Sequence, residues 1–224
     1  MAPKDIDEAE QWLRKDLESN GLRDVQFNLT NGQFSYKDSK QNSYGLNLAT
    51  LVSTSLSRDD KSGLWRVTYV SYQSDKPFYW QNRSRDRAER FEAALRFLVQ
   101  QCVRNIEAAT DAELKKFNPQ AETWRALAQK PKMPDDAYAH KVLAEAAYRD
   151  KNLQKAMVEY ALALQAFPTW PEGQFNAALI GAELKYYRGA VLHMQEYLAL
   201  VPDAPDAQAA KDKIIIWKDK TTHP

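Results

Sequence analysis

The sequence has almost no cysteine, little histidine and no clustering of the two. Cys102 is the only cysteine among 224 residues, so an intramolecular disulfide framework is excluded. The three histidines, His140, His193 and His223, have no ligand-like spacing with one another or with Cys102. We therefore predict neither a zinc site nor any other cofactor. Cys102 lies on the apolar stripe of an expected helix, which favours a buried core thiol over a reactive nucleophile.

Long apolar runs and net charge are also missing. No apolar run approaches the roughly 18 residues that a membrane-spanning helix needs. A net charge of +1 gives no basic surface for general nucleic-acid binding, and 44% hydrophobic residues are ordinary for a globular protein. The chain begins with polar residues and no signal-peptide core. That start fits a cytoplasmic protein, and equally a periplasmic protein or membrane-anchored lipoprotein whose leader was removed, so the compartment stays open.

What the C-terminal half does have is an internal repeat. The segments 137–170 and 171–204 align with one another along their whole length. The aligned positions include Ala156 with Ala190, Leu164 with Leu198, Pro168 with Pro202 and Pro171 with Pro205. Apolar residues recur at helical spacing on both sides of a polar break at 150–152, which predicts a pair of helices in the first unit. Proline cannot continue a helix, so each pair should end at its proline.

Paired helices that repeat every ~34 residues resemble the tetratricopeptide repeat (TPR), whose pattern is W-x2-L-G-x2-Y, then A-x3-F, then P. The matching positions are Leu143-Ala144, Ala156, Tyr160 and Pro168 in the first copy and Ala177-Ala178, Ala190, Met194 and Pro202 in the second. His140 and Gln174 replace the tryptophan of the pattern. The resemblance implies TPR 1 over 137–170, TPR 2 over 171–204 and a capping helix over 205–220.

The resemblance also implies a groove, because the first helices of TPR repeats line a concave face that binds peptides. By register, the residues expected there are Tyr138, Lys141, Glu145, Tyr148, Glu172, Phe175, Asn176 and Leu179. Some TPR proteins grip a C-terminal carboxylate, and Lys141 and Asn176 match two positions of that clamp. Glu145 and Asp206 stand where an Asn and a Lys are expected, and both would repel a carboxylate. We therefore expect a mixed aromatic and polar groove for a protein or peptide partner.

In the N-terminal half the period changes from helical to alternating. Residues 1–23 predict a helix, with Asp5 and Glu8 as an approximate capping box. Residues 24–108 then contain about six short alternating runs, an Asn31-Gly32 hairpin turn and a final amphipathic helix. Hairpins closed by one helix resemble the pleckstrin-homology-like (PH-like) fold in topology alone, and another α+β roll is the open alternative. The whole chain is thus expected to be α+β, a β-rich roll followed by an all-α TPR solenoid.

The join over 109–136 is expected to be a linker with two short helices, around 110–116 and 121–128. Trp124 resembles the opening residue of a third repeat, which the prolines at 131 and 134 would stop. We predict that this segment packs over the open face of the first repeat. The alternative is that it, or the N-terminal half, fills the groove itself.

Four arginines gather where the last helix of the N-terminal half should begin: Arg83, Arg85, Arg87 and Arg90. They could form an anion-binding site, but cations at a helix N-terminus oppose its dipole. The favoured interpretation is a solvated face on which Asp86, Glu89 and Glu92 partner the arginines.

No Ser-His-Asp or Cys-His arrangement, phosphate-binding loop or metal cluster is recognisable in the sequence. We therefore expect a non-enzymatic interaction or scaffold module that binds a protein or peptide through the TPR groove. The alternatives are membrane-surface or anionic-ligand binding through the N-terminal half, a purely structural assembly component, and an enzyme. The sequence leaves a homo-oligomer open.

Overall fold

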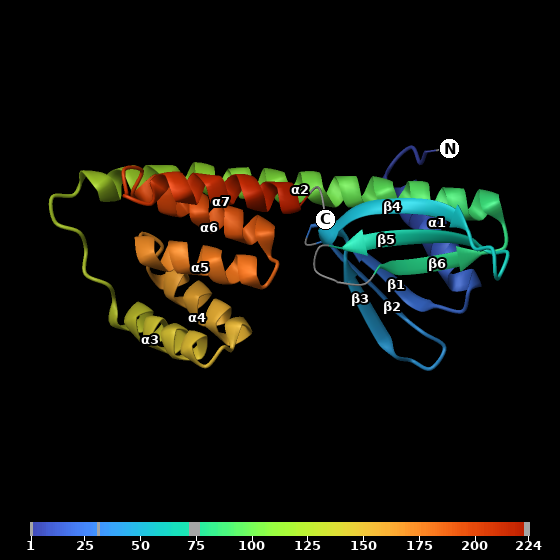
Figure 1. Cartoon of the computed structure of the whole chain (residues 1–224), viewed down its shortest axis with the longest axis horizontal. Coiled ribbons are helices and arrows are strands. Elements are labelled where there is room, and N and C mark those ends of the chain that lie inside the picture. The colour runs from blue at the N-terminus through green and yellow to red at the C-terminus, as the bar shows by residue number, and fades with distance from the viewer. Residues whose placement is uncertain (1, 31, 72–76, 222–224) are drawn as a thin grey trace. The chain divides into compact units, whose positions relative to one another are not determined.

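The structure, a computed structural model, describes residues 2–30, 32–71 and 77–221 of the chain (Figure 1). It is α+β: an N-terminal helix and two three-stranded antiparallel sheets precede, within the described residues, six helices that pack in pairs. The chain divides into two compact units, with the boundary between Ala109 and Thr110. Helix α2 (Arg85–Ala126) contributes residues to both units.

The first unit begins with helix α1 (Ile6–Ser19), whose N-terminus is capped by a side chain. The Glu8 amide donates to Asp5 Oδ1 over 2.9 Å, which satisfies one of the free N–H groups of the first turn. The Glu8 carboxylate accepts from the Lys4 amide at 2.6 Å, so the expected capping box is displaced by one residue. Gly21, at φ +85°, then reverses the chain, and this backbone conformation favours glycine.

Six strands follow, as the alternating pattern predicted. The first sheet has the order β1-β2-β3 and the second the order β4-β5-β6, and all neighbours are antiparallel. Their bounds are β1 Arg23–Asn28, β2 Gln33–Lys37, β3 Ser43–Asn47, β4 Leu51–Arg58, β5 Trp65–Ser71 and β6 Phe78–Asn82. Of the predicted Asn31-Gly32 turn, Asn31 lies outside the described residues. A Cβ on Gly32 would come within 2.5 Å of Asn47 Oδ1, so this position requires glycine.

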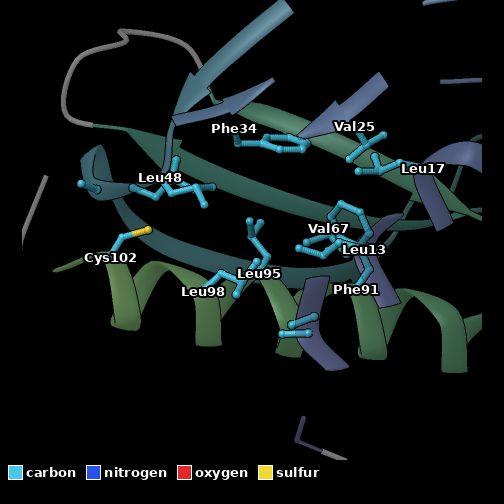
Figure 2. Close-up of a cluster of buried hydrophobic side chains, with 14 of the residues drawn as sticks. Leu13, Leu17, Val25, Phe34, Leu48, Val67, Phe91, Leu95, Leu98 and Cys102 are labelled. Carbon is cyan, nitrogen blue, oxygen red and sulfur yellow. The ribbon is translucent and has the colours of Figure 1, made fainter. Parts of the chain in front are cut away.

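The core of the first unit forms where α1, the strands and the N-terminal half of α2 meet. Figure 2 shows Leu13, Val67 and Leu98, one from each of these three parts, within one apolar cluster. The prediction of an apolar stripe that includes Cys102 is confirmed, because five residues at helical spacing on α2 are buried: Ala88, Phe91, Leu95, Leu98 and Cys102. The Phe91 ring stacks on Trp80 with centroids 4.2 Å apart. Cys102 is fully buried, as expected.

The expected break after this stripe is absent, because α2 runs without interruption from Arg85 to Ala126. The prediction of two short helices was therefore wrong. Residues 105–116 contain neither glycine nor proline, and their polar side chains are mostly exposed on the helix surface. A polar run of this kind interrupts an apolar stripe without favouring a turn. Pro119 lies inside the helix, where it removes one backbone hydrogen bond without ending the helix.

The second unit contains two helix pairs that match one another at the period of the sequence repeat. The helices are α3 Asp135–Arg149, α4 Leu153–Ala166, α5 Pro171–Glu183, α6 Tyr187–Leu200 and α7 Ala207–Lys220. Helix α4, moved along the chain by one repeat, coincides with α6, and the end of α3 coincides with that of α5. Lys151 and Lys185, which are equivalent in the two copies, have φ angles of +56° and +61°. The repeat read from the sequence is therefore a repeat of backbone structure.

A polar pair joins the two helices of each repeat at equivalent positions. His140 Nδ1 lies 2.8 Å from Glu159 Oε2, between α3 and α4. Gln174 Oε1 and His193 Nδ1 occupy the same two positions of the second copy, also 2.8 Å apart. His140 and Gln174, which stand at the tryptophan position of the repeat pattern, thus each connect the first helix of their pair to a polar side chain of the second helix. Ala156 and Ala190 are fully buried at the crossings, where short side chains let the helices approach closely.

The C-terminal part of α2 packs elsewhere in the second unit than we predicted. Phe117 and Ala121 are buried against Leu200, at the end of α6, with Trp124 partly buried beside them. Val142 and Leu143, on the face of the first repeat that this segment was expected to cover, remain 43% and 45% exposed. For Phe117 and Ala121 that prediction was wrong, because the apolar side of α2 matches the end of the second repeat. Met133 of the same segment does pack against the core of the first repeat.

Candidate functional site

The candidate site lies on the exposed sides of α3 and α5, the first helices of the two repeats. Four of the eight residues predicted for a groove line one cavity of about 280 Å³: Glu145, Tyr148, Asn176 and Leu179. Arg149, Tyr160 and Ile180 complete its wall. Tyr148 is 48% exposed, so an aromatic ring is available at the rim.

Local structure fixes the floor of this cavity. The N-terminus of α4 is capped by Asn152, whose Oδ1 accepts from the Lys155 amide at 3.1 Å. Helix α4 presents Tyr160, which is 3% exposed, and its hydroxyl accepts from Asn176 Nδ2 over 3.2 Å. Burial is the main cause that raises the pKa of Tyr160, so its hydroxyl stays protonated at neutral pH. A neutral hydroxyl and a primary amide therefore meet at the base of the pocket, whose lining also includes the charged Glu145 and Arg149.

Three more predicted residues, Tyr138, Lys141 and Glu172, line a second and more open hollow of about 410 Å³. Trp170 also lines this hollow; it is 5% exposed, and its Nε1 donates to Glu172 Oε2 at 2.7 Å. Lys141 Nζ lies 5.5 Å from the centroid of the Trp170 ring, within cation–π range. Tyr138 is 56% exposed, so this hollow too has an aromatic ring at the surface.

The eighth predicted residue, Phe175, belongs to neither hollow. It is half-buried against Tyr197 of α6, with ring centroids 5.0 Å apart and an edge-to-face orientation. Tyr197 also donates to Asp206 Oδ1 at 2.5 Å, and burial together with this bond raises its pKa to about 12. Phe175 is therefore a packing residue that links α5 to α6.

Sequence reasoning missed Arg149, Tyr160 and Trp170. Arg149 follows Glu145 by four residues and thus shares its helical face, a spacing that could have revealed it. In the sequence Tyr160 is recognisable only as a position of the repeat pattern, whereas in the structure it also lines the cavity. Nothing in the sequence indicates that the Trp170 ring lies near both Lys141 of α3 and Gly173 of α5.

The charges of this face are mixed. Glu145 and Arg149 line the cavity, and Lys141 Nζ lies 3.9 Å from Glu145 Oε1. Among the described residues no group of histidine, cysteine and carboxylate side chains is arranged to hold a metal ion. The cavity wall offers aromatic, amide and charged groups but no cysteine, serine or histidine as a nucleophile or base.

The four arginines of the predicted anion site do not converge. Arg83 is exposed before the start of α2. Arg85 pairs with Glu89 at 2.6 Å and lies over the Trp65 ring. Only Arg87 and Arg90 line a common cleft, against α1. Arg85 is therefore exposed and paired with an acidic neighbour, as the solvated interpretation expects.

Comparison of the chain with protein-family models, with curated proteins and with solved structures finds no match. Within the described residues no helix is both long and apolar enough to cross a membrane, α2 included.

Proposed function

We propose that the second unit is a short TPR array and that the chain is a non-enzymatic interaction module, which binds a peptide or partner segment on the α3 and α5 face. Support for a TPR assignment comes from the equivalence of the two helix pairs at the repeat period, their buried small residues and the final helix α7. Ala207, Ala210 and Trp217 of α7 are buried, as a capping helix requires.

The observation that carries the binding proposal is the cavity of about 280 Å³ between α3, α4 and α5. The long helix of the same unit does not fill it, because Phe117 and Ala121 are buried against Leu200 instead. Tyr138 and Tyr148 are each about half exposed on this face, and exposed aromatic rings are the side chains that contribute most to protein interfaces.

The chemistry of the cavity indicates the kind of peptide that fits. Tyr148, Leu179 and Ile180 would enclose an apolar side chain, and Asn176 offers an amide to the peptide backbone. Glu145 and Arg149 give the rim both signs of charge, so a terminal carboxylate would gain from one and be repelled by the other. An internal segment with one apolar anchor residue is the ligand that this arrangement favours.

For the first unit we propose a PH-like roll to which α1 has been added. Two three-stranded antiparallel sheets followed by one helix that buries its apolar stripe support this assignment. No binding role is drawn from the topology, because a fold of this kind serves many functions.

The test is a selection of random displayed peptides on the full chain, followed by affinity measurement with the double variant Tyr148→Ala/Asn176→Ala. We expect the selected peptides to bind this variant at least tenfold more weakly. Val158→Ala is the matched control, because Val158 is 58% exposed on α4 and lies outside the cavity. Peptides that bind all three proteins equally would place the interaction surface elsewhere and refute the proposal.

A further inference from the structure

A separate cleft of about 540 Å³ lies in the first unit, between α1 and the first turns of α2. Its lining residues come from one face of each helix: Gln11, Trp12, Lys15, Asp16 and Ser19 of α1, and Arg87 and Arg90 of α2. A volume of this size is in the range of small-molecule sites. None of these residues belongs to the α3 and α5 face.

The Arg87 guanidinium is held in a fixed position inside this cleft. Its Nε donates to Asp16 Oδ1 at 2.6 Å, and Nη2 contacts the same carboxylate and the Ser19 hydroxyl. The Asp16 side chain is only 10% exposed, and burial raises its pKa although Arg87 opposes that shift. Among the described residues Nη1 makes no hydrogen bond, so the free edge of an oriented guanidinium remains for a ligand.

Two further cations line the cleft and are not held in this way by a carboxylate of the described residues. Lys15 and Arg90 are both exposed, and neither forms an ion pair within the described residues. With Arg87 and Asp16 counted, the lining carries three cations and one carboxylate, a net charge of +2. Arg87 also lies in the first turn of α2, where a cation opposes the helix dipole and an added anion would relieve the conflict.

We propose that this cleft binds a phosphomonoester group, with Lys15, Arg87 and Arg90 as its ligands and the Trp12 ring beside the adjoining part of the molecule. A phosphomonoester carries a charge of about −1.5 to −2 at pH 7, which matches the lining, whereas a single carboxylate would leave one cation unpaired. Arginine recognises such oxygens with two parallel hydrogen bonds, and lysine adds a mobile point charge. The same group occurs on free metabolites and on the lipid phosphatidic acid.

The experiment is an NMR titration of the full chain with inorganic phosphate, phenyl phosphate and phenyl sulfate, at physiological ionic strength. We expect saturable shifts of the Trp12 indole N–H and the Arg87 Nε–H signals with both phosphates, and weaker binding of the monoanionic sulfate. Lys15→Ala/Arg90→Ala should weaken binding of phenyl phosphate at least tenfold. Lys15→Arg/Arg90→Lys, which keeps both charges, should bind within about threefold of the wild type.

The matched control is Lys61→Ala/Arg83→Ala, which removes the same charge from exposed positions of the first unit that lie outside the cleft. Equal weakening by both alanine pairs, or shifts that do not saturate, would show diffuse ion attraction and overturn the proposal. Thermal melts of each variant verify that the fold is intact.

Sedimentation with phosphatidic acid vesicles, against phosphatidylcholine vesicles, distinguishes the two sources of the group. Co-sedimentation that Lys15→Ala/Arg90→Ala abolishes supports a lipid headgroup. Binding of phenyl phosphate without co-sedimentation supports a soluble ligand. Absence of both would refute the site.

Discussion

Gly173 occupies a position on α5 where the neighbouring ring leaves no room for a side chain. A Cβ added there would overlap the Trp170 ring, which is 5% exposed and stacked on Tyr160 with centroids 5.9 Å apart. Gly181 lies on the same helix, but an added Cβ would meet the Ala190 Cβ at 3.6 Å, an ordinary contact. Sterics therefore require glycine at position 173 but not at position 181.

We therefore predict opposite effects of the same substitution. Gly173→Ala should lower the free energy of unfolding by about 1–3 kcal/mol, because the Trp170 ring must move in a packed core. Gly181→Ala should raise it by about 0.5–1 kcal/mol, because alanine has less conformational entropy to lose in a helix. Urea denaturation of the two variants measures both values. A stabilising Gly173→Ala would show that the Trp170 ring does not lie over α5.

Cys102 offers a second measurement at the scale of one residue. Burial raises the pKa of its thiol to about 11, and the side chain is fully buried. We expect an aromatic disulfide reagent to react with the native protein at pH 8 far more slowly than with the unfolded chain. Since the pKa is raised in the folded state, the thiol stabilises the fold below about pH 9, and this contribution is lost as the pH rises through about 11. Rapid labelling of the native protein would contradict the described core.

At the scale of elements, the end of α2 is held by a side chain from the segment that follows it. Lys130 Nζ donates to the carbonyl oxygens of Trp124, Arg125 and Leu127 at 2.9, 3.0 and 2.9 Å. The same ammonium lies 4.5 Å from the centroid of the Trp124 ring. A cation at the C-terminal end of a helix satisfies free carbonyl groups and interacts favourably with the negative end of the helix dipole.

Lys130→Ala should lower the free energy of unfolding by about 0.5–1 kcal/mol, the usual contribution of a charge at a helix end. Lys132→Ala, two residues further along the chain and also exposed, removes the same charge without touching the helix and should change little. Chemical denaturation at low and high salt measures the difference, which salt should reduce. Equal effects of the two substitutions would mean that Lys130 does not cap the helix.

At the scale of the whole molecule, the units share α2, and its C-terminal part belongs to the core of the second. Phe117, Ala121 and Leu200 are each at most 5% exposed. A fragment of residues 135–224 would expose Leu200, whereas a fragment of 110–224 keeps it covered. We expect the longer fragment to unfold cooperatively and the shorter one to be less stable and to associate through the uncovered surface.

Phe117→Ala in the longer fragment tests the same contact with one substitution. It should cost about 3 kcal/mol, as for a buried phenylalanine, while the exposed neighbour Lys116→Ala serves as control. Urea melts at several protein concentrations separate stability from association. Identical transitions for the two fragments would show that α2 is not part of this core.

How much of the site could be predicted depends on the distance in sequence between its parts. The faces that carry Glu145 and Tyr148 on α3 and Asn176 on α5 were predictable, because helical spacing within each repeat fixes which side chains share a face. The contribution of Tyr160 was not, because a residue of a second helix reaches the cavity only after the helices pack. The arrangement of the four arginines could not be predicted for the same reason, because Asp16, which orients Arg87, is 71 residues away in the chain.

The six strands, the helix α1 and the repeated helix pair follow from local patterns in the amino-acid sequence, because alternation, capping and helical spacing act between residues close in the chain. The continuation of α2 through its polar stretch, and the packing of Phe117 on the end of α6 instead of on the first repeat, depend on the folded arrangement of the helices. The same holds for the cleft that Lys15 and Arg90 both line, and for the contact of Tyr160 with Asn176. Contacts of this kind depend on how complete apolar faces match in three dimensions, which local patterns do not encode.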